Sequence, residues 1–123
     1  MSLFSKLFVG GTGTAKAVGP AEAHELARSG AFLVDVRERH EYAAGHAPGS
    51  VHIPLGELST RLSRIPQGKT VLTVCRSGAR SARAARLLRG AGYTVINVRG
   101  GMSAWAAAGL PVQAKNGRPG QIG

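Results

Sequence analysis

The chain of 123 residues contains a single cysteine, Cys75. One cysteine cannot form an internal disulfide, which excludes a disulfide-stapled secreted scaffold, a two-cysteine redox motif and a multi-cysteine metal site. The histidines do not have the spacing of metal ligands, so we expect no bound metal and no cofactor. A lone cysteine is compatible with a reducing compartment, and we expect a cytoplasmic protein.

Long hydrophobic runs are also absent. No apolar run approaches the roughly 20 residues that a membrane span needs. The N-terminal stretch, residues 1–9, lacks the charged region, the apolar core and the cleavage site of a signal peptide. Its Leu and Phe side chains could touch a membrane surface or a partner, but a frayed N-terminus is the simpler interpretation.

Acidic residues are scarce, with 6 Asp and Glu against 16 Lys and Arg and a net charge of +10. Such a balance favours anionic partners. Five arginines crowd into and just after the loop of the cysteine: Arg76, Arg80, Arg83, Arg86 and Arg89. A solvated helix face explains some of them. No basic stretch is interleaved with aromatic residues for base stacking, so we expect a small anionic substrate and consider nucleic acid unlikely.

Apolar periodicity predicts alternating strands and helices. Short apolar runs predict buried strands at residues 31–36, 50–53, 70–74 and 93–98. Apolar residues at helical spacing, bounded by Pro and Gly, predict helices at residues 20–29, 38–44, 55–65, 80–91 and 102–108. Strands that alternate with helices, without hairpin signals, indicate an α/β fold with a parallel sheet covered on both faces. Residues 10–19 are interpreted as a linker and residues 116–123 as a mobile tail.

The carboxyl ends of parallel strands meet at one edge of a sheet, where ligands bind in such folds. The predicted strands end near Arg37, Pro54, Cys75 and Arg99. We therefore expect the chemistry of the protein at this edge.

Cys75 follows a buried strand and begins the loop Cys75–Ser81, which contains Gly78. Free amide N–H groups of the next helix point back at this loop and can form an anion-binding nest. A thiolate in such a nest is stabilised, so we expect a thiol pKa below the free value of about 8.5, with Arg76 and Arg80 adding positive charge. A buried structural cysteine is the alternative. The Gly-containing loop and the helix N-terminus favour the functional interpretation.

Roles are also expected for several residues outside this loop. Asp35 is expected to brace the edge of the sheet, whereas Arg37 could equally well brace it or face the active site. His46 is expected to pack or to form hydrogen bonds in a turn. Met102 and Trp105 are expected in the core.

Several motifs, in order, resemble the rhodanese family. Residues 33–38 (LVDVRE), 41–42 (EY) and 45–54 (GHAPGSVHIP) resemble the first half of a rhodanese domain. Residues 75–81 (CRSGARS) resemble its active-site loop, and residues 92–111 resemble its closing segment. The resemblance covers residues 18–112, which we expect to lie between a flexible N-terminal segment, residues 1–17, and a flexible tail, residues 113–123.

The resemblance implies a rhodanese-like fold, with a central, mostly parallel five-stranded sheet and helices on both faces. It implies a thiosulfate sulfurtransferase in which Cys75 takes a sulfane sulfur as a persulfide and passes it to cyanide or a thiol. The residues that would cradle the transferred sulfur are Arg76, Ser77, Gly78, Ala79, Arg80 and Ser81, with Arg37 as a further substrate contact.

Loop length argues against a related activity. From Cys75 to Arg80 the loop spans six residues, as in sulfurtransferases, whereas the related dual-specificity phosphatases use C-x5-R. The position that such a phosphatase needs for Arg is Ser81 here. Two alternatives to the enzyme stay open: a persulfide carrier for a protein acceptor, with little turnover on thiosulfate, and an interaction module.

Overall fold

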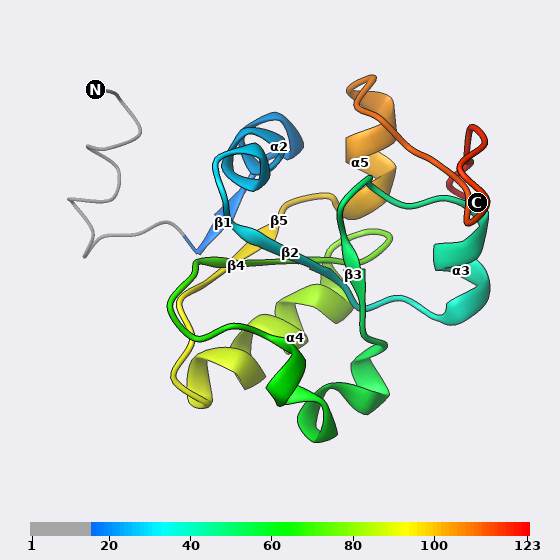
Figure 1. Cartoon of the computed structure of the whole chain (residues 1–123). Helices are drawn as coiled ribbons and strands as arrows, with labels where there is room; N and C mark the ends of the chain where they lie inside the picture. Colours follow the sequence, from blue (N-terminus) through cyan, green and yellow to red (C-terminus); the bar gives the residue numbers. More distant parts are fainter. Residues whose placement is uncertain (1–15) are drawn as a thin grey trace.

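The computed structural model describes residues 16–123 and contains the five strands and the helices labelled in Figure 1. The strands are β1 (Ala17–Val18), β2 (Phe32–Asp35), β3 (Val51–His52), β4 (Val71–Val74) and β5 (Val95–Val98). The α-helices are α2 (Pro20–Arg28), α3 (Arg39–Ala44), α4 (Ala79–Gly90) and α5 (Gly101–Ala107), and two 3-10 helices are η2 (Leu55–Thr60) and η3 (Leu62–Arg64). None of the helices in this part of the chain is long and apolar enough to cross a bilayer.

The strands form one sheet in the order β1-β5-β4-β2-β3, and every described strand pair is parallel. Helices α2 and α5 cover one face, while α4 and the 3-10 helices cover the other (Figure 1). Helix α3 lies at the end of the sheet beyond β3. The predicted α/β fold with helices on both faces is confirmed. Because the strands are parallel, their carboxyl ends share one edge, where Cys75 follows the central strand β4.

Two elements differ from the sequence-based prediction. Strand β1 lies inside the stretch interpreted as a linker, and Val18 accepts a hydrogen bond of 2.7 Å from the Arg99 amide. Its two residues are too short for a periodic pattern, so the free edge of β5 specifies this strand. Residues 55–65, expected as one helix, form η2 and η3 because Arg61, with φ −125° and ψ 26°, leaves helical geometry between them.

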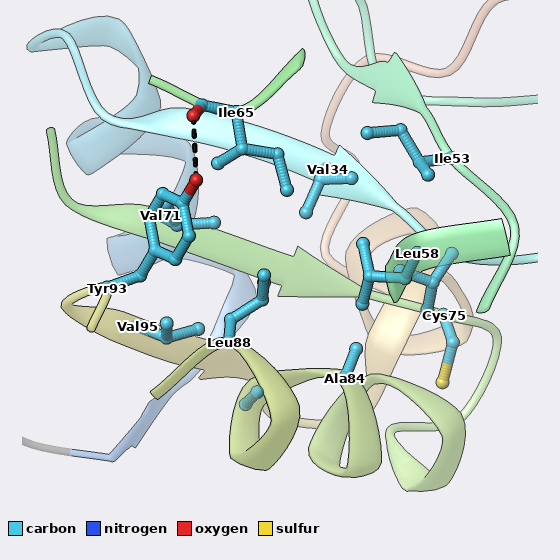
Figure 2. Packing of buried hydrophobic residues seen from close by; sticks show 12 residues of the cluster. Val34, Ile53, Leu58, Ile65, Val71, Cys75, Ala84, Leu88, Tyr93 and Val95 are labelled. Carbon is cyan, nitrogen blue, oxygen red and sulfur yellow. Dashed lines mark hydrogen bonds between the residues drawn. The ribbon is translucent and has the colours of Figure 1, made fainter. Parts of the chain in front are cut away.

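The core forms two clusters, one on each face of the sheet, because successive strand residues point to opposite faces. In β4, Val71 faces α4 with Leu88 and Tyr93, whereas Leu72 and Val74 face α2 and α5. Figure 2 shows the first cluster, in which the Tyr93 hydroxyl donates a hydrogen bond of 3.0 Å to the Ile65 carbonyl. Met102 and Trp105 are buried in the second cluster, as predicted.

The C-terminal segment, expected as a flexible tail, lies against α3. The Gln121 amide donates to the Ala44 carbonyl over 2.9 Å, and Gln113 pairs with His46. The backbones at Gly45 and Gln121 lie so close together that a Cβ on Gly45 would be 2.7 Å from the Gln121 backbone nitrogen. These partners are backbone groups, so the composition of the tail did not indicate them. The predicted N-terminal segment lies outside the described residues up to residue 15, and Ala17 belongs to β1.

Candidate active site

Cys75 is the first residue after β4, and its side chain continues the alternation that points Val71 and Thr73 toward α4. Gly78 is the N-cap of α4 and has φ +114°, a left-handed conformation that glycine adopts without strain. This conformation turns the chain from the strand into the helix over the four residues 75–78. Figure 2 shows the Cys75 sulfur pointing toward the first turn of α4.

Hydrogen-bond donors of the loop face the Cys75 sulfur. The Gly78 amide donates to Sγ over 3.1 Å, and Ser81 Oγ lies 3.3 Å from Sγ. Cys75 is 1% exposed. Burial raises the pKa of the thiol, but the Ser81 hydroxyl and the amides of Ser81, Gly78 and Ser77 outweigh it, so the pKa is lowered. The sulfur is buried as in a structural cysteine, yet its surroundings favour the thiolate.

The carbonyl groups of the loop are held away from the sulfur. Asn97 Nδ2 donates a hydrogen bond of 3.2 Å to the Gly78 carbonyl, and Thr73 Oγ1 donates one of 3.1 Å to the Ser81 carbonyl. The Cys75 carbonyl accepts from the Met102 amide over 2.7 Å. These contacts fix the backbone at Cys75, Gly78 and Ser81, and they help to hold the Gly78 and Ser81 amides toward the sulfur.

Gly101, at the start of α5, permits this packing. It has φ +59°, and a Cβ built on it would collide with the backbone carbonyl of Cys75 and lie 2.6 Å from the carbonyl carbon of Arg76. Only glycine allows α5 to begin so close to the loop.

Arg80 does not direct its guanidinium at a substrate position. It binds Glu41 of α3 through two hydrogen bonds, of 2.7 and 3.0 Å. The Arg80 hydrogen bonds hold the pKa of Glu41 at about 2, against the opposing effect of burial. The pKa of Arg80 is raised, mainly by Glu41 and also by the nearby Cys75 sulfur. The pair therefore ties the first turn of α4 to α3.

Arg37 is buried and similarly engaged. Its guanidinium binds the Asp35 carboxylate, with Nη2 2.8 Å from Oδ2. Nη2 also donates a hydrogen bond of 2.6 Å to the Gly45 carbonyl. This geometry braces the edge of the sheet. The side chain also reaches a surface hollow of about 350 Å³, whose lining consists of Arg37, His40, Glu41, Ala44, Arg76 and Gly123.

The predicted loop residues thus divide into three groups, one of which is Arg80, bound to Glu41. Ser77, Gly78 and Ser81 face Cys75 through amide or hydroxyl donors, whereas the side chains of Arg76 and Ala79 are exposed. Two further hollows, near Lys69 and Thr70, lie at the amino end of β4, away from Cys75.

Sequence reasoning missed four residues around the loop: Glu41, Thr73, Asn97 and Gly101. Thr73 and Asn97 had a local signal, because each is a polar residue within an apolar strand. Glu41 had none, since it lies 39 residues from Arg80. Gly101 follows another glycine after a strand, which indicates a turn and not the close approach that the structure shows.

Comparisons with known proteins agree with this architecture. The family model of the rhodanese-like domain matches residues 19–108. A sulfurtransferase of Allochromatium vinosum is 44% identical over 87 residues, which cover 70% of this chain and 81% of the relative. Thiosulfate sulfurtransferase GlpE of Pseudomonas savastanoi pv. phaseolicola is 34% identical, with 75% and 88% covered.

A solved structure shares the fold. The crystal structure of a rhodanese-related protein from Thermoplasma volcanium superposes with a TM-score of 0.74 at 30% identity, covering 79% of this chain and 96% of that one. The resemblance seen in the motifs is therefore confirmed at the level of the family. The chain belongs to the rhodanese-like domain family and is related to its sulfurtransferases.

Proposed function

We propose that this protein is a sulfurtransferase that takes a sulfane sulfur from an anionic donor such as thiosulfate and carries it as a persulfide on Cys75. The observation that supports this proposal most is the donor set around Sγ. The Gly78 amide and the Ser81 hydroxyl lie within hydrogen-bond distance of Sγ, and the thiol pKa is lowered despite burial. A thiolate is the nucleophilic form of cysteine.

The first half-reaction needs no oxidant. The Cys75 thiolate attacks the outer sulfur of thiosulfate, the new Sγ–S bond forms, and the S–S bond of the donor breaks. Its electron pair leaves with sulfite. No general base is required, because the nucleophile is already ionised. The loop amides then stabilise the negative charge of the terminal persulfide sulfur.

The second half-reaction regenerates the thiolate. Cyanide or a thiolate attacks the outer sulfur of the persulfide, the Sγ–S bond breaks, and its electron pair returns to Cys75. Sulfur enters and leaves in separate steps, so ping-pong kinetics are expected. The exposed Arg76 is suited to attract an anionic donor to this edge, and Arg37 lines the neighbouring hollow.

The dimensions of the loop favour sulfur over phosphate. The first turn of α4 begins four residues after Cys75, and Arg80 is held by Glu41. The thiol is nearly enclosed, which suits a single added sulfur atom better than a tetrahedral phosphate. The relation to a thiosulfate sulfurtransferase of another organism supports thiosulfate as the donor. The chemistry requires a reduced thiol, and on this basis we expect a cytoplasmic location.

Intact mass spectrometry tests the proposal. Incubation with thiosulfate is expected to add one sulfur atom to the wild-type chain and none to Cys75→Ser, and cyanide is expected to remove it as thiocyanate. A gain from a low-molecular-weight persulfide but not from thiosulfate would favour the persulfide carrier instead. No gain from either donor would contradict sulfur transfer, and hydrolysis of an aryl phosphate would favour a phosphatase.

A further inference from the structure

Negative charge is confined to one part of the chain. All six carboxylate side chains occur within its first 57 residues: Glu22, Glu25, Asp35, Glu38, Glu41 and Glu57. Residues 58–123 contain nine arginines, two lysines and no Asp or Glu. The positive charge of this region has no acidic side chain of its own to balance it.

Helix α4 concentrates this charge on one exposed face. With 3.6 residues per turn, its solvent-exposed residues form a single stripe that we call the α4 face: Ala79, Arg83, Arg86, Leu87 and Gly90. The opposite side of the helix is buried in the core. Leu87, which is 37% exposed, is the one large hydrophobic side chain exposed among residues 16–123. The face therefore joins two arginines to an exposed apolar side chain.

The two arginines of the α4 face are not neutralised within the described chain. The one ion pair that α4 makes among residues 16–123 joins Arg80 to Glu41, in the first turn. Arg83 and Arg86 take part in no ion pair or side-chain hydrogen bond there. Residues 1–15 contain no Asp or Glu either. The positive charge of Arg83 and Arg86 is therefore available to a partner.

The α4 face begins next to the reactive sulfur. Ala79 follows Cys75 by four residues, and the Gly78 amide before it is bonded to Sγ. At 1.5 Å per residue, Arg83 lies about 6 Å and Arg86 about 10 Å along the helix axis from Ala79. A protein bound on this face is thus held within reach of the edge of the sheet where sulfur would enter and leave.

We propose that the α4 face docks an acidic protein that exchanges sulfur with Cys75. This inference rests on the proposed function and adds the class of macromolecular partner and its place of docking. An exposed Leu beside two arginines is consistent with the composition of protein interfaces, which have an apolar core and are enriched in Arg. Nucleic acid fits less well, because the face offers no aromatic ring for stacking, and both Trp105 and Tyr93 are buried. Charge complementarity steers such a partner and sets its orientation.

A binding measurement tests the surface without relying on catalysis. The probe is a short fluorescent peptide with one cysteine, one leucine and several glutamates, and its matched control has glutamine at each glutamate position. The variant Arg83→Glu/Arg86→Glu reverses the α4 face. Arg28→Glu/Lys69→Glu makes the same change in net charge at exposed sites, Arg28 on the helix across the sheet and Lys69 at its amino edge.

The wild type is expected to bind the glutamate peptide at about 0.01 M salt. This binding is expected to be lost at about 0.3 M salt, where the screening length is shorter. Reversal of the α4 face is expected to weaken this binding about tenfold or more, and the control reversal about twofold at most. Equal weakening by both variants would overturn the proposal. It would also be overturned by binding of duplex DNA through Arg83 and Arg86 without a preference for the glutamate peptide.

Sulfur discharge separates this proposal from the proposed function. The persulfide of the wild type is expected to pass sulfur to the glutamate peptide faster than to the glutamine peptide. Reversal of the α4 face is expected to remove this difference and to leave discharge to cyanide within about twofold, because cyanide needs no docking surface. A chain that binds the glutamate peptide but accepts no sulfur would contradict the function alone. Equal discharge to both peptides by the wild type would contradict the docking surface alone.

Discussion

Asn97 Nδ2 donates a hydrogen bond of 3.2 Å to the carbonyl oxygen of Gly78, whose own amide is bonded to Cys75 Sγ. The same Asn97 side chain lies 3.4 Å from Thr73 Oγ1, which donates to the Ser81 carbonyl. Thr73 of β4 and Asn97 of β5 thus hold the Ser81 and Gly78 carbonyls of the loop. These contacts position the backbone at Gly78 and Ser81, two of the residues whose amides face the sulfur.

Replacement of Asn97 by Ala is therefore expected to raise the pKa of Cys75. Without the Asn97 donor, the Gly78 carbonyl keeps only the Ala82 amide and Ser81 Oγ as partners, so the Gly78 backbone, and with it the amide that faces Sγ, is held less firmly. Alkylation by iodoacetamide at about pH 6 is expected to slow about threefold to tenfold, since one pKa unit corresponds to a tenfold change in thiolate. Thr94→Ala, at an exposed position just before β5, is the control and is expected to react like the wild type. An unchanged pH profile in Asn97→Ala would show that Asn97 does not position the loop.

Replacement of Ser81 by Ala removes a donor from the sulfur itself. Ser81 Oγ has one hydrogen and two nearby acceptors, Sγ at 3.3 Å and the Gly78 carbonyl at 3.2 Å. Its loss is expected to raise the thiol pKa, so the pH profile of sulfur uptake moves to higher pH. The rate at about pH 9.5, where free thiols are largely ionised as well, is expected to change by less than about threefold. A loss of rate that persists across the whole pH range would instead assign Ser81 a role beyond ionisation.

The pair of Arg80 and Glu41 is expected to make stability depend on pH in acid. The pKa of Glu41 falls from 4.5 to about 2 on folding, so its contribution is fully present above about pH 4.5 and is lost as the pH falls toward 2. We expect about 1–2 kcal/mol of unfolding free energy from it, because partial exposure screens the pair. Urea unfolding at about pH 7 and pH 3 measures this difference.

Glu41→Gln is expected to be less stable than the wild type at neutral pH and to lose less stability on acidification. Glu22→Gln removes an exposed carboxylate that is in no ion pair among residues 16–123, and it is the matched control. If Glu41→Gln and the wild type lost stability in parallel between these pH values, the pair would contribute nothing measurable.

The sequence predicted the elements whose signals are local. Short apolar runs such as that of β4, with Gly and Pro at the element ends, defined the α/β order, and the glycine in the loop after a buried strand marked Cys75 as a candidate nucleophile. The lowered thiol pKa agrees in direction with the nest inferred from that loop. The arginines stabilise the thiolate less directly than expected, because Arg80 is bound to Glu41 and Arg37 to Asp35.

Contacts between segments distant in sequence could not be predicted in this way. Strand β1 exists because the edge of β5 offers it free backbone groups, and the C-terminal segment lies on α3 through backbone hydrogen bonds. Neither depends on a side-chain pattern. Gly101 is a similar case, since its requirement for glycine comes from carbonyl groups of a loop more than twenty residues earlier in the chain.

Gly101→Ala is expected to damage both stability and the active site. The added Cβ would meet backbone, which cannot rotate away as a side chain can, and the φ of +59° is itself strained for alanine. We expect a loss of about 2–4 kcal/mol in the free energy of unfolding and slower alkylation of Cys75, because the Cys75 carbonyl must move. Gly90→Ala is the control: a Cβ at this helical position has no neighbour within 4 Å, and a gain of about 0.5–1 kcal/mol is expected. If Gly101→Ala matched the wild type in both stability and alkylation rate, the close contact between α5 and the loop would not be what holds the loop in place.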